Sequence, residues 1–245
     1  MRKIKLTIEY DGTKYHGWQI QKNANSVQET MEKAISKLLG SEVSLVGCSR
    51  TDVGVHAYGQ VAHFLTASSI PAEKFSYAIN NLLPNDIVIR QSEEVSEDFH
   101  SRYSAKGKKY RYLIYNDAHA SAIMRNRSYH VRPELCFEEL QRAASYFIGQ
   151  HDFAAFQATG GQVRSTVREI YSVDVSKKED KLICIEVSGN GFLYNMVRII
   201  AGTLIYVGMG KISADDISRI IQGKDRTKAG KTAPAEGLYL MEIYY

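Results

Sequence analysis

The sequence predicts an α+β protein built from two split-βαβ (ferredoxin-like) halves that share a mainly antiparallel central sheet flanked by helices. The main observation is the order of elements, because the patterns of strand, helix, strand, strand, helix and strand occur twice along the chain. A length of 245 residues, of which 44% are hydrophobic, is enough to bury a substantial core. The expected halves are residues 1–105 and 106–245.

In the first half, residues 3–10 alternate polar and apolar side chains, as a half-buried strand does. Ser26 is the expected N-cap of a helix that ends near residue 39, and Glu29 completes a capping box. The remaining expected elements are strand-like runs at 43–46 and 60–64, a helix from Pro71 to about residue 83, and a strand at 87–89.

In the second half, residues 108–115 alternate in the same way, and Pro133 opens a helix with one apolar side. The other expected elements are strands at 167–175 and 182–187, helices at about 192–207 and 215–221, and a last strand at 237–245. The two halves do not visibly repeat in sequence, so their likeness lies in element order.

Charge and cysteine content limit the possible partners. The net charge is +4, and the second half carries 20 Lys and Arg against 15 Asp and Glu, which suits a polyanion. The three cysteines lack CxxC spacing and indicate neither a disulfide framework nor a zinc site. Residues 1–6 contain no apolar leader, and residues 191–208 are too short and polar to span a bilayer, so we expect a cytoplasmic protein without a membrane partner.

The segment Gly47–Ala57 is the strongest candidate for chemistry. It places one carboxylate, Asp52, beside Arg50 between two expected strands, where side chains are held on a rigid frame yet remain open to a ligand. Arg50 can bind a phosphate, and Asp52 can act as a nucleophile or a base. The alternative is a surface turn in which Arg50 pairs with Asp52 and Gly54 supplies a positive φ.

Two further segments combine cations with apolar side chains. On a strand, Tyr110 and Tyr112 face the opposite way from Lys109 and Arg111. This pattern suits base stacking and phosphate contact. The alternative is an ordinary amphipathic strand with a solvated basic face. Arg198 lies alone in an apolar helix and therefore needs a carboxylate or phosphate partner, unless its guanidinium reaches solvent at the helix edge.

Taken together, these motifs resemble the TruA family of tRNA pseudouridine synthases. The family signature Gly-Arg-Thr-Asp-x-Gly-Val-His-Ala is matched from Arg50 to Ala57, with Ser49 in place of the usual glycine. Further matches follow in order over nearly the whole chain: Tyr10 to Thr13 with Gly17 to Gln19, Phe99 to Arg102, Lys109 to Tyr112, Gly191 to Arg198, and Thr232 to Ala235 with Gly237 and Leu238.

The resemblance implies a pseudouridine synthase fold and an isomerase that converts uridine to pseudouridine at positions 38, 39 and 40 of the tRNA anticodon arm. It implies that Asp52 is the catalytic aspartate, that Tyr110 lies against the target base, that Arg198 pairs with Asp52, and that Arg50 helps to hold the nucleotide out of the stack. It also implies a homodimer that binds tRNA and uses neither a metal nor an organic cofactor.

The implied chemistry fits these residue types. Asp52 can attack the sugar C1′ or add to the pyrimidine ring, and either role needs the anion, which a neighbouring arginine favours. Two rival functions remain: a non-catalytic tRNA-binding protein on the same fold, and a Mg²⁺-dependent phosphohydrolase that uses Asp11 of the segment Glu9 to Thr13.

Overall fold

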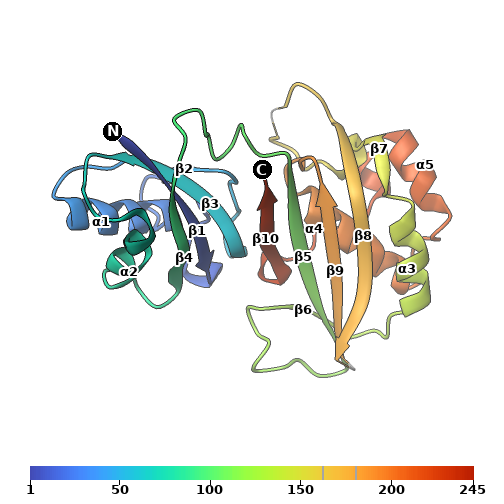
Figure 1. The fold of residues 1–245 in the computed structure, drawn as a ribbon. Coiled ribbons are helices and arrows are strands. Elements are labelled where there is room, and N and C mark those ends of the chain that lie inside the picture. The colour runs from blue at the N-terminus through green and yellow to red at the C-terminus, as the bar shows by residue number, and fades with distance from the viewer. Residues whose placement is uncertain (162, 180) are drawn as a thin grey trace. The chain divides into compact units, whose positions relative to one another are not determined.

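The structure, a computed structural model, describes residues 1–161, 163–179 and 181–245 and contains two compact units (Figure 1). The first unit comprises Met1–Lys106 together with Tyr239–Tyr245, and the second comprises Gly107–Leu238. The end of the chain therefore clusters with its beginning, and each unit has strands and helices of its own.

The first unit is built on strands β4, β1, β3 and β10, adjacent in that order, with β2 also paired to β3. Pairing is antiparallel except between β3 and β10, where His56 lies opposite Tyr239. The strand bounds are β1 (Arg2–Tyr10), β2 (Val46–Gly47), β3 (His56–Thr66), β4 (Ile87–Val95) and β10 (Leu238–Tyr244).

The helices of this unit are α1 (Val27–Leu39) and α2 (Phe75–Asn80), and α2 packs on β4. The cap expected for α1 is confirmed, because Ser26 Oγ accepts a hydrogen bond of 3.2 Å from the Glu29 amide. The side chain of Glu29 pairs with Lys33. Gly40 ends the helix at a left-handed φ of 68°.

Strand β3 is covered on both faces, which explains its nearly continuous burial. Phe64 packs edge-on against Phe75 of α2, with ring centroids 5.6 Å apart. On the other face, His63 packs against the rings of Phe99 and His100 in the segment that follows β4. A strand fixed on both sides is a rigid support for the loop that precedes it.

The second unit is built on strands β5, β9, β8 and β7, adjacent in that order and antiparallel, with β6 parallel to β5. The strand bounds are β5 (Gly107–Asn116), β6 (Tyr129–Val131), β7 (Gly149–Asp152), β8 (Val167–Glu179) and β9 (Leu182–Gly189). The helices are α3 (Phe137–Ser145), α4 (Met196–Gly208) and α5 (Asp216–Gly223). Helix α3 packs on α4 and β8, so this unit also has its helices against its strands (Figure 1).

The α+β class and the mainly antiparallel pairing are confirmed, whereas several element bounds differ from expectation. The helix expected from Pro71 to residue 83 is a 3₁₀ turn followed by α2, which ends at Asn80, where the side chain bonds to both backbone groups of Ile89. Helix α4 starts at Met196 rather than residue 192, because Asn195 has a left-handed φ of 60°. The sequence does not predict the short strands β6 and β7, because three or four residues are too few to show the alternation of polar and apolar side chains.

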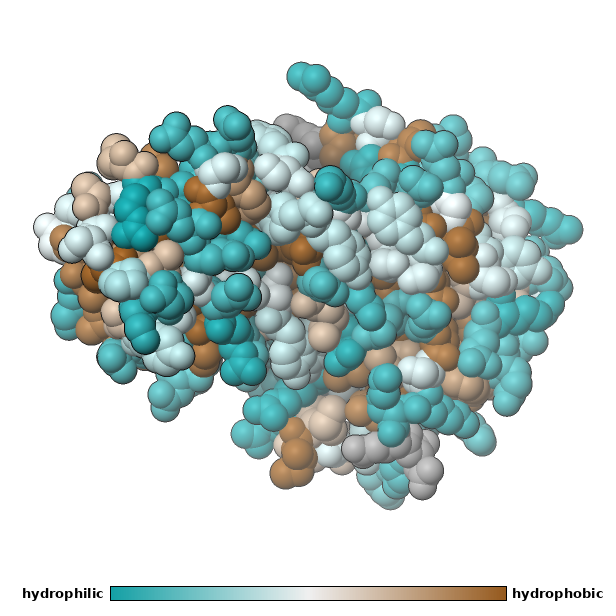
Figure 2. Space-filling view, in the orientation of Figure 1, coloured by the Kyte–Doolittle hydropathy of each residue, from teal (hydrophilic) through white to brown (hydrophobic). Residues whose placement is uncertain are grey.

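Across the described part of the chain, every helix falls short of the length and apolarity that a bilayer crossing requires. Figure 2 shows a mostly hydrophilic face on which apolar side chains are scattered singly or in small groups.

Candidate active site

The loop that carries Asp52 joins β2 to β3 and is fixed to the sheet at its start. The Cys48 amide donates to the Val61 carbonyl at 2.8 Å. The fully buried side-chain amide of Gln60 binds both backbone groups of Ser49, donating to its carbonyl at 2.6 Å and accepting from its amide at 3.2 Å. Ser49, which replaces the usual glycine, is itself 4% exposed and leaves little surface for an RNA contact.

The residue before Asp52 is held from two directions. The hydroxyl of Tyr10 and Oγ1 of Thr51 share a buried hydrogen bond of 2.7 Å. The Thr51 carbonyl accepts from the Trp18 amide at 3.0 Å. Gly17, at a φ of +86°, has no room for a side chain because an added Cβ would lie 2.4 Å from that same carbonyl. Thr51 therefore has one well-defined position relative to β1.

The residues after Asp52 are fixed in a similar way. The Asp52 carbonyl accepts from the Val55 amide at 3.2 Å, and Gly54 has the expected positive φ, +77°. Gly12 lies so close to Val55 that an added Cβ would be 2.0 Å from its carbonyl oxygen. The Gly12 amide donates to Nδ1 of His56 at 3.1 Å. Backbone contacts on both sides thus determine where the Asp52 side chain begins.

Within this frame, the Asp52 side chain is half-buried and Arg50 is exposed. The neighbouring acid, Asp11, has a different setting: its Oδ1 accepts from the Thr13 amide at 3.0 Å and from the Thr13 hydroxyl, and it lies 3.2 Å from His56 Nδ1. In the ranges that the structure describes, no group of three or more His, Cys, Asp or Glu side chains is placed to hold a metal ion.

Tyr110 lies on β5 of the second unit, opposite Val187 of β9, and is half-buried. Its ring meets Phe192 edge to face, with centroids 5.2 Å apart at 87°. Two residues further on, the fully buried Tyr112 donates its hydroxyl proton to the Pro234 carbonyl at 2.7 Å. Burial raises the pKa of Tyr112 well above its usual value, so this phenol stays a donor. Tyr110 thus has one edge packed against Phe192 and a ring that is partly exposed.

The basic face of β5 is neutralised within the second unit. Lys109 and Arg111 both pair with Glu186 of β9, at 2.9 and 2.7 Å. Burial opposes the ionisation of Glu186, but hydrogen bonds from these two cations outweigh it, and the pKa of Glu186 is lowered. The alternation expected for this strand is present, yet its cations already have a protein carboxylate as a partner.

Arg198 lies in the first turn of α4 and joins two of the matched sequence motifs, Gly191 to Arg198 and Thr232 to Ala235. Its Nε donates to the Ala233 carbonyl at 2.7 Å, and its Nη1 donates to Oδ1 of Asn195 at 2.8 Å. The Ala233 amide returns a bond to the Arg198 carbonyl at 3.1 Å. An added Cβ on Gly202 would lie 1.8 Å from the Lys231 carbonyl oxygen, so the two segments are in direct backbone contact.

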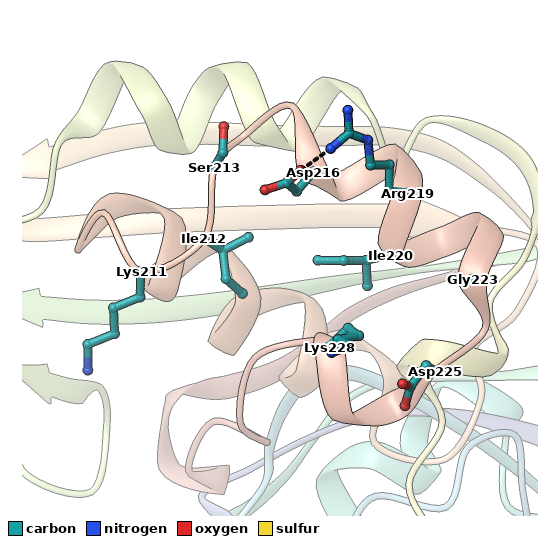
Figure 3. A pocket seen from close by; sticks show the side chains of 9 residues that line it. All are labelled: Lys211, Ile212, Ser213, Asp216, Arg219, Ile220, Gly223, Asp225 and Lys228. Carbon is teal, nitrogen blue, oxygen red and sulfur yellow. Dashed lines mark hydrogen bonds and ion pairs between the residues drawn. The ribbon is translucent and has the colours of Figure 1, made fainter.

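The supporting residues lie within the matched sequence motifs, but the sequence predicts no role for them: Tyr10, Trp18, Asn195 and Ala233. A pocket of about 310 Å³ in the second unit involves none of the expected site residues. Ile212 and Ile220 point towards each other across it, and the rim includes an ion pair between Arg219 and Asp216 (Figure 3). The expected site residues therefore divide between the loop of the first unit (Arg50, Asp52) and β5 and α4 of the second (Tyr110, Arg198).

Comparisons with known proteins establish the family. The model of the family described as tRNA pseudouridine synthase matches residues 6–104 and 143–245. The chain is 78% identical to the tRNA pseudouridine synthase A of Ruminiclostridium cellulolyticum and 60% identical to that of Acetivibrio thermocellus, and both alignments cover 100% of each chain. The chain belongs to the tRNA pseudouridine synthase family. It is accordingly an isomerase that modifies RNA, and the resemblance found in its motifs is confirmed.

Proposed function

We propose that this isomerase converts uridine to pseudouridine at positions 38, 39 and/or 40 of the tRNA anticodon stem-loop, with Asp52 as the nucleophile. The observation that carries the proposal is the loop around Asp52, where Thr51 and Val55 are fixed by hydrogen bonds and by glycines that leave no space for a side chain. A reacting carboxylate must be held in one geometry, and this loop provides such a support.

The reaction rearranges bonds within one nucleoside. The N1–C1′ bond breaks, the base turns, and C5 bonds to C1′; C5 loses its proton and N1 gains one, so the atoms balance without an oxidant or a phosphate donor. Asp52 serves as the nucleophile, towards C1′ or towards the pyrimidine ring, and in both routes the carboxylate must be ionised.

The other three residues would bind and position the nucleotide. A uridine in a stem must flip out of the helix at a cost of a few kcal/mol, and stacking of its base against Tyr110 would offset about 1–3 kcal/mol of that cost. The exposed Arg50 is suited to a phosphate of the distorted strand. Arg198, whose guanidinium is oriented by Ala233 and Asn195, would keep Asp52 ionised.

The enzyme would act as a homodimer without a metal or organic cofactor, as the resemblance implies, and in the cytoplasm, as expected from the sequence. Sedimentation of the purified protein tests the dimer.

The decisive experiment uses unmodified tRNA labelled with tritium at uridine C5. We expect wild-type protein to release tritium without added metal, and Asp52→Asn to lower that rate by at least about 1000-fold while tRNA still binds. Asp11→Asn is the matched control, since Asp11 is a nearby carboxylate with a local structural role, and we expect it to keep most of the activity. Chemical mapping of the product locates the modified positions.

Each rival has its own outcome. Wild-type protein that binds tRNA but releases no tritium would indicate a non-catalytic tRNA-binding protein. Mg²⁺-dependent phosphate release that Asp11→Asn abolishes would indicate the phosphohydrolase. Full tritium release by Asp52→Asn would show that Asp52 is not the nucleophile.

A further inference from the structure

The segment between β4 and β5 contains a turn whose base is firmly attached to the first unit. Ser101 is fully buried; its hydroxyl donates to the Val46 carbonyl at 2.7 Å, and its amide donates to Nδ1 of His63 at 3.2 Å. The Ser101 carbonyl accepts from the Tyr245 hydroxyl at 2.7 Å. Phe99 is packed between the rings of His63 and Tyr245. The turn is thus joined to β2, β3 and the end of the chain.

The tip of this turn, residues 100–104, is closed around the imidazole of His100. Nδ1 of His100 accepts from the amides of Arg102 and Tyr103 at 3.2 and 3.3 Å. The His100 carbonyl accepts a hydrogen bond from the Ser104 amide, and the His100 amide donates one to the Ser104 hydroxyl. The His100 ring lies 4.3 Å from the Tyr103 ring, centroid to centroid. The tip is therefore ordered before any ligand arrives.

This ordered tip nevertheless presents Tyr103 to solvent, with 78% of the residue exposed. The Arg102 guanidinium carbon lies 5.9 Å from the centre of the Tyr103 ring. Residues 100–106 contain two cations, Arg102 and Lys106, and no carboxylate, although Glu97 and Asp98 precede them. An immobilised aromatic ring beside a cation has the chemistry that binds an unpaired nucleotide, whose base stacks and whose phosphate pairs.

We infer that Tyr103 and Arg102 form an additional RNA-binding contact, in which an unpaired base of the tRNA stacks on Tyr103 and its phosphate pairs with Arg102. The inference rests on the proposed tRNA substrate. Since the contact involves neither Asp52 nor Tyr110, it contributes to affinity for tRNA rather than to the bond rearrangement. Its rigidity reduces the ordering cost that binding would otherwise impose.

The test is a titration of unmodified tRNA by fluorescence anisotropy at fixed ionic strength. We expect Tyr103→Ala to raise Kd by about 5- to 100-fold, and Tyr103→Phe, which retains the stacking surface, to bind as wild type does. We expect Arg102→Ala to weaken binding and to lower the slope of log Kd against log salt by about 1. None of these side chains supports the fold by its burial, so the variants should remain folded.

Tyr77→Ala is the matched control, because Tyr77 is 69% exposed in the same unit and also has a cation, Lys74, over its ring, yet it lies on a helix without the closed tip. Equal Kd values for Tyr103→Ala and Tyr77→Ala would overturn the inference. A Tyr103→Ala variant with an unchanged Kd but a changed sedimentation coefficient would also overturn it, because that result would indicate a contact between protein chains. Tritium release separates the two proposals. If the proposed function holds, Tyr103→Ala still releases tritium at saturating tRNA, regardless of its Kd for tRNA.

Discussion

The hydroxyl of Tyr10, at the end of β1, lies 2.7 Å from Oγ1 of Thr51, the residue directly before Asp52. The two residues are 41 positions apart in the chain, and both are buried. This hydrogen bond connects β1, an inner strand of the first unit, to the loop that carries the proposed nucleophile.

We expect Tyr10→Phe to lower the free energy of unfolding by about 1–2 kcal/mol, because the Thr51 hydroxyl loses its buried partner. Turnover should fall more than tRNA affinity, since the change loosens the support of Asp52 rather than an RNA contact. Urea denaturation and single-turnover tritium release measure the two effects. Adding Thr51→Val to Tyr10→Phe removes both polar groups and should recover part of the stability; wild-type turnover in Tyr10→Phe would contradict the role of this bond.

Gly17→Ala should destabilise the protein by more than about 2 kcal/mol and abolish turnover, because strain at a positive φ adds to a Cβ clash with the Thr51 carbonyl. Gly40→Ala is the control, since Gly40 also has a positive φ, +68°, but an added Cβ would meet nothing within 4 Å. That variant should lose only about 1 kcal/mol. Equal losses in chemical denaturation would show that the close approach at Gly17 is unimportant.

Much of the site could be predicted from the sequence, because the relevant information is local. The strand-like apolar runs at 43–46 and 60–64 identify a loop between strands, which the structure has between β2 and β3, and Gly54 has the positive φ that its turn requires. The partners of the loop could not be predicted, because they come from distant segments. The same limitation applies to the cations of β5. Their partner, Glu186, lies 75 residues from Arg111 along the chain, so the sequence alone does not show that these cations are paired.

Replacing Arg198 with lysine should lower turnover and move the acid limb of the pH–rate profile to higher pH. The lysine cannot reproduce the two bonds to Ala233 and Asn195, so its charge would be poorly oriented and the proposed carboxylate anion less favoured. Single-turnover rates between pH 5 and 8 measure this. If the rate and the profile both stayed as in wild type, Arg198 would have no part in ionising Asp52.

Stability should depend on pH through His63. Burial first, and then the nearby His100 and Lys3, lower the pKa of His63 to about 4, and its Nδ1 accepts from the Ser101 amide as a neutral ring must. An unfolded histidine takes up its proton near pH 6.5, so stability should fall by roughly 2–3 kcal/mol as pH drops from about 6.5 towards 4. His63→Gln keeps an acceptor and should flatten this dependence in urea midpoints; an unchanged slope would exclude His63 as its source.

The parallel pairing of β10 with β3 has a consequence for biosynthesis. The first unit needs residues 239–245 to complete its sheet, and the Tyr245 hydroxyl to hold the turn at Ser101. A ribosome delivers those residues only after all of residues 107–238, so the nascent N-terminal segment must wait with one strand edge unfilled. The earliest-made part of the enzyme is therefore completed only by the last residues to be made.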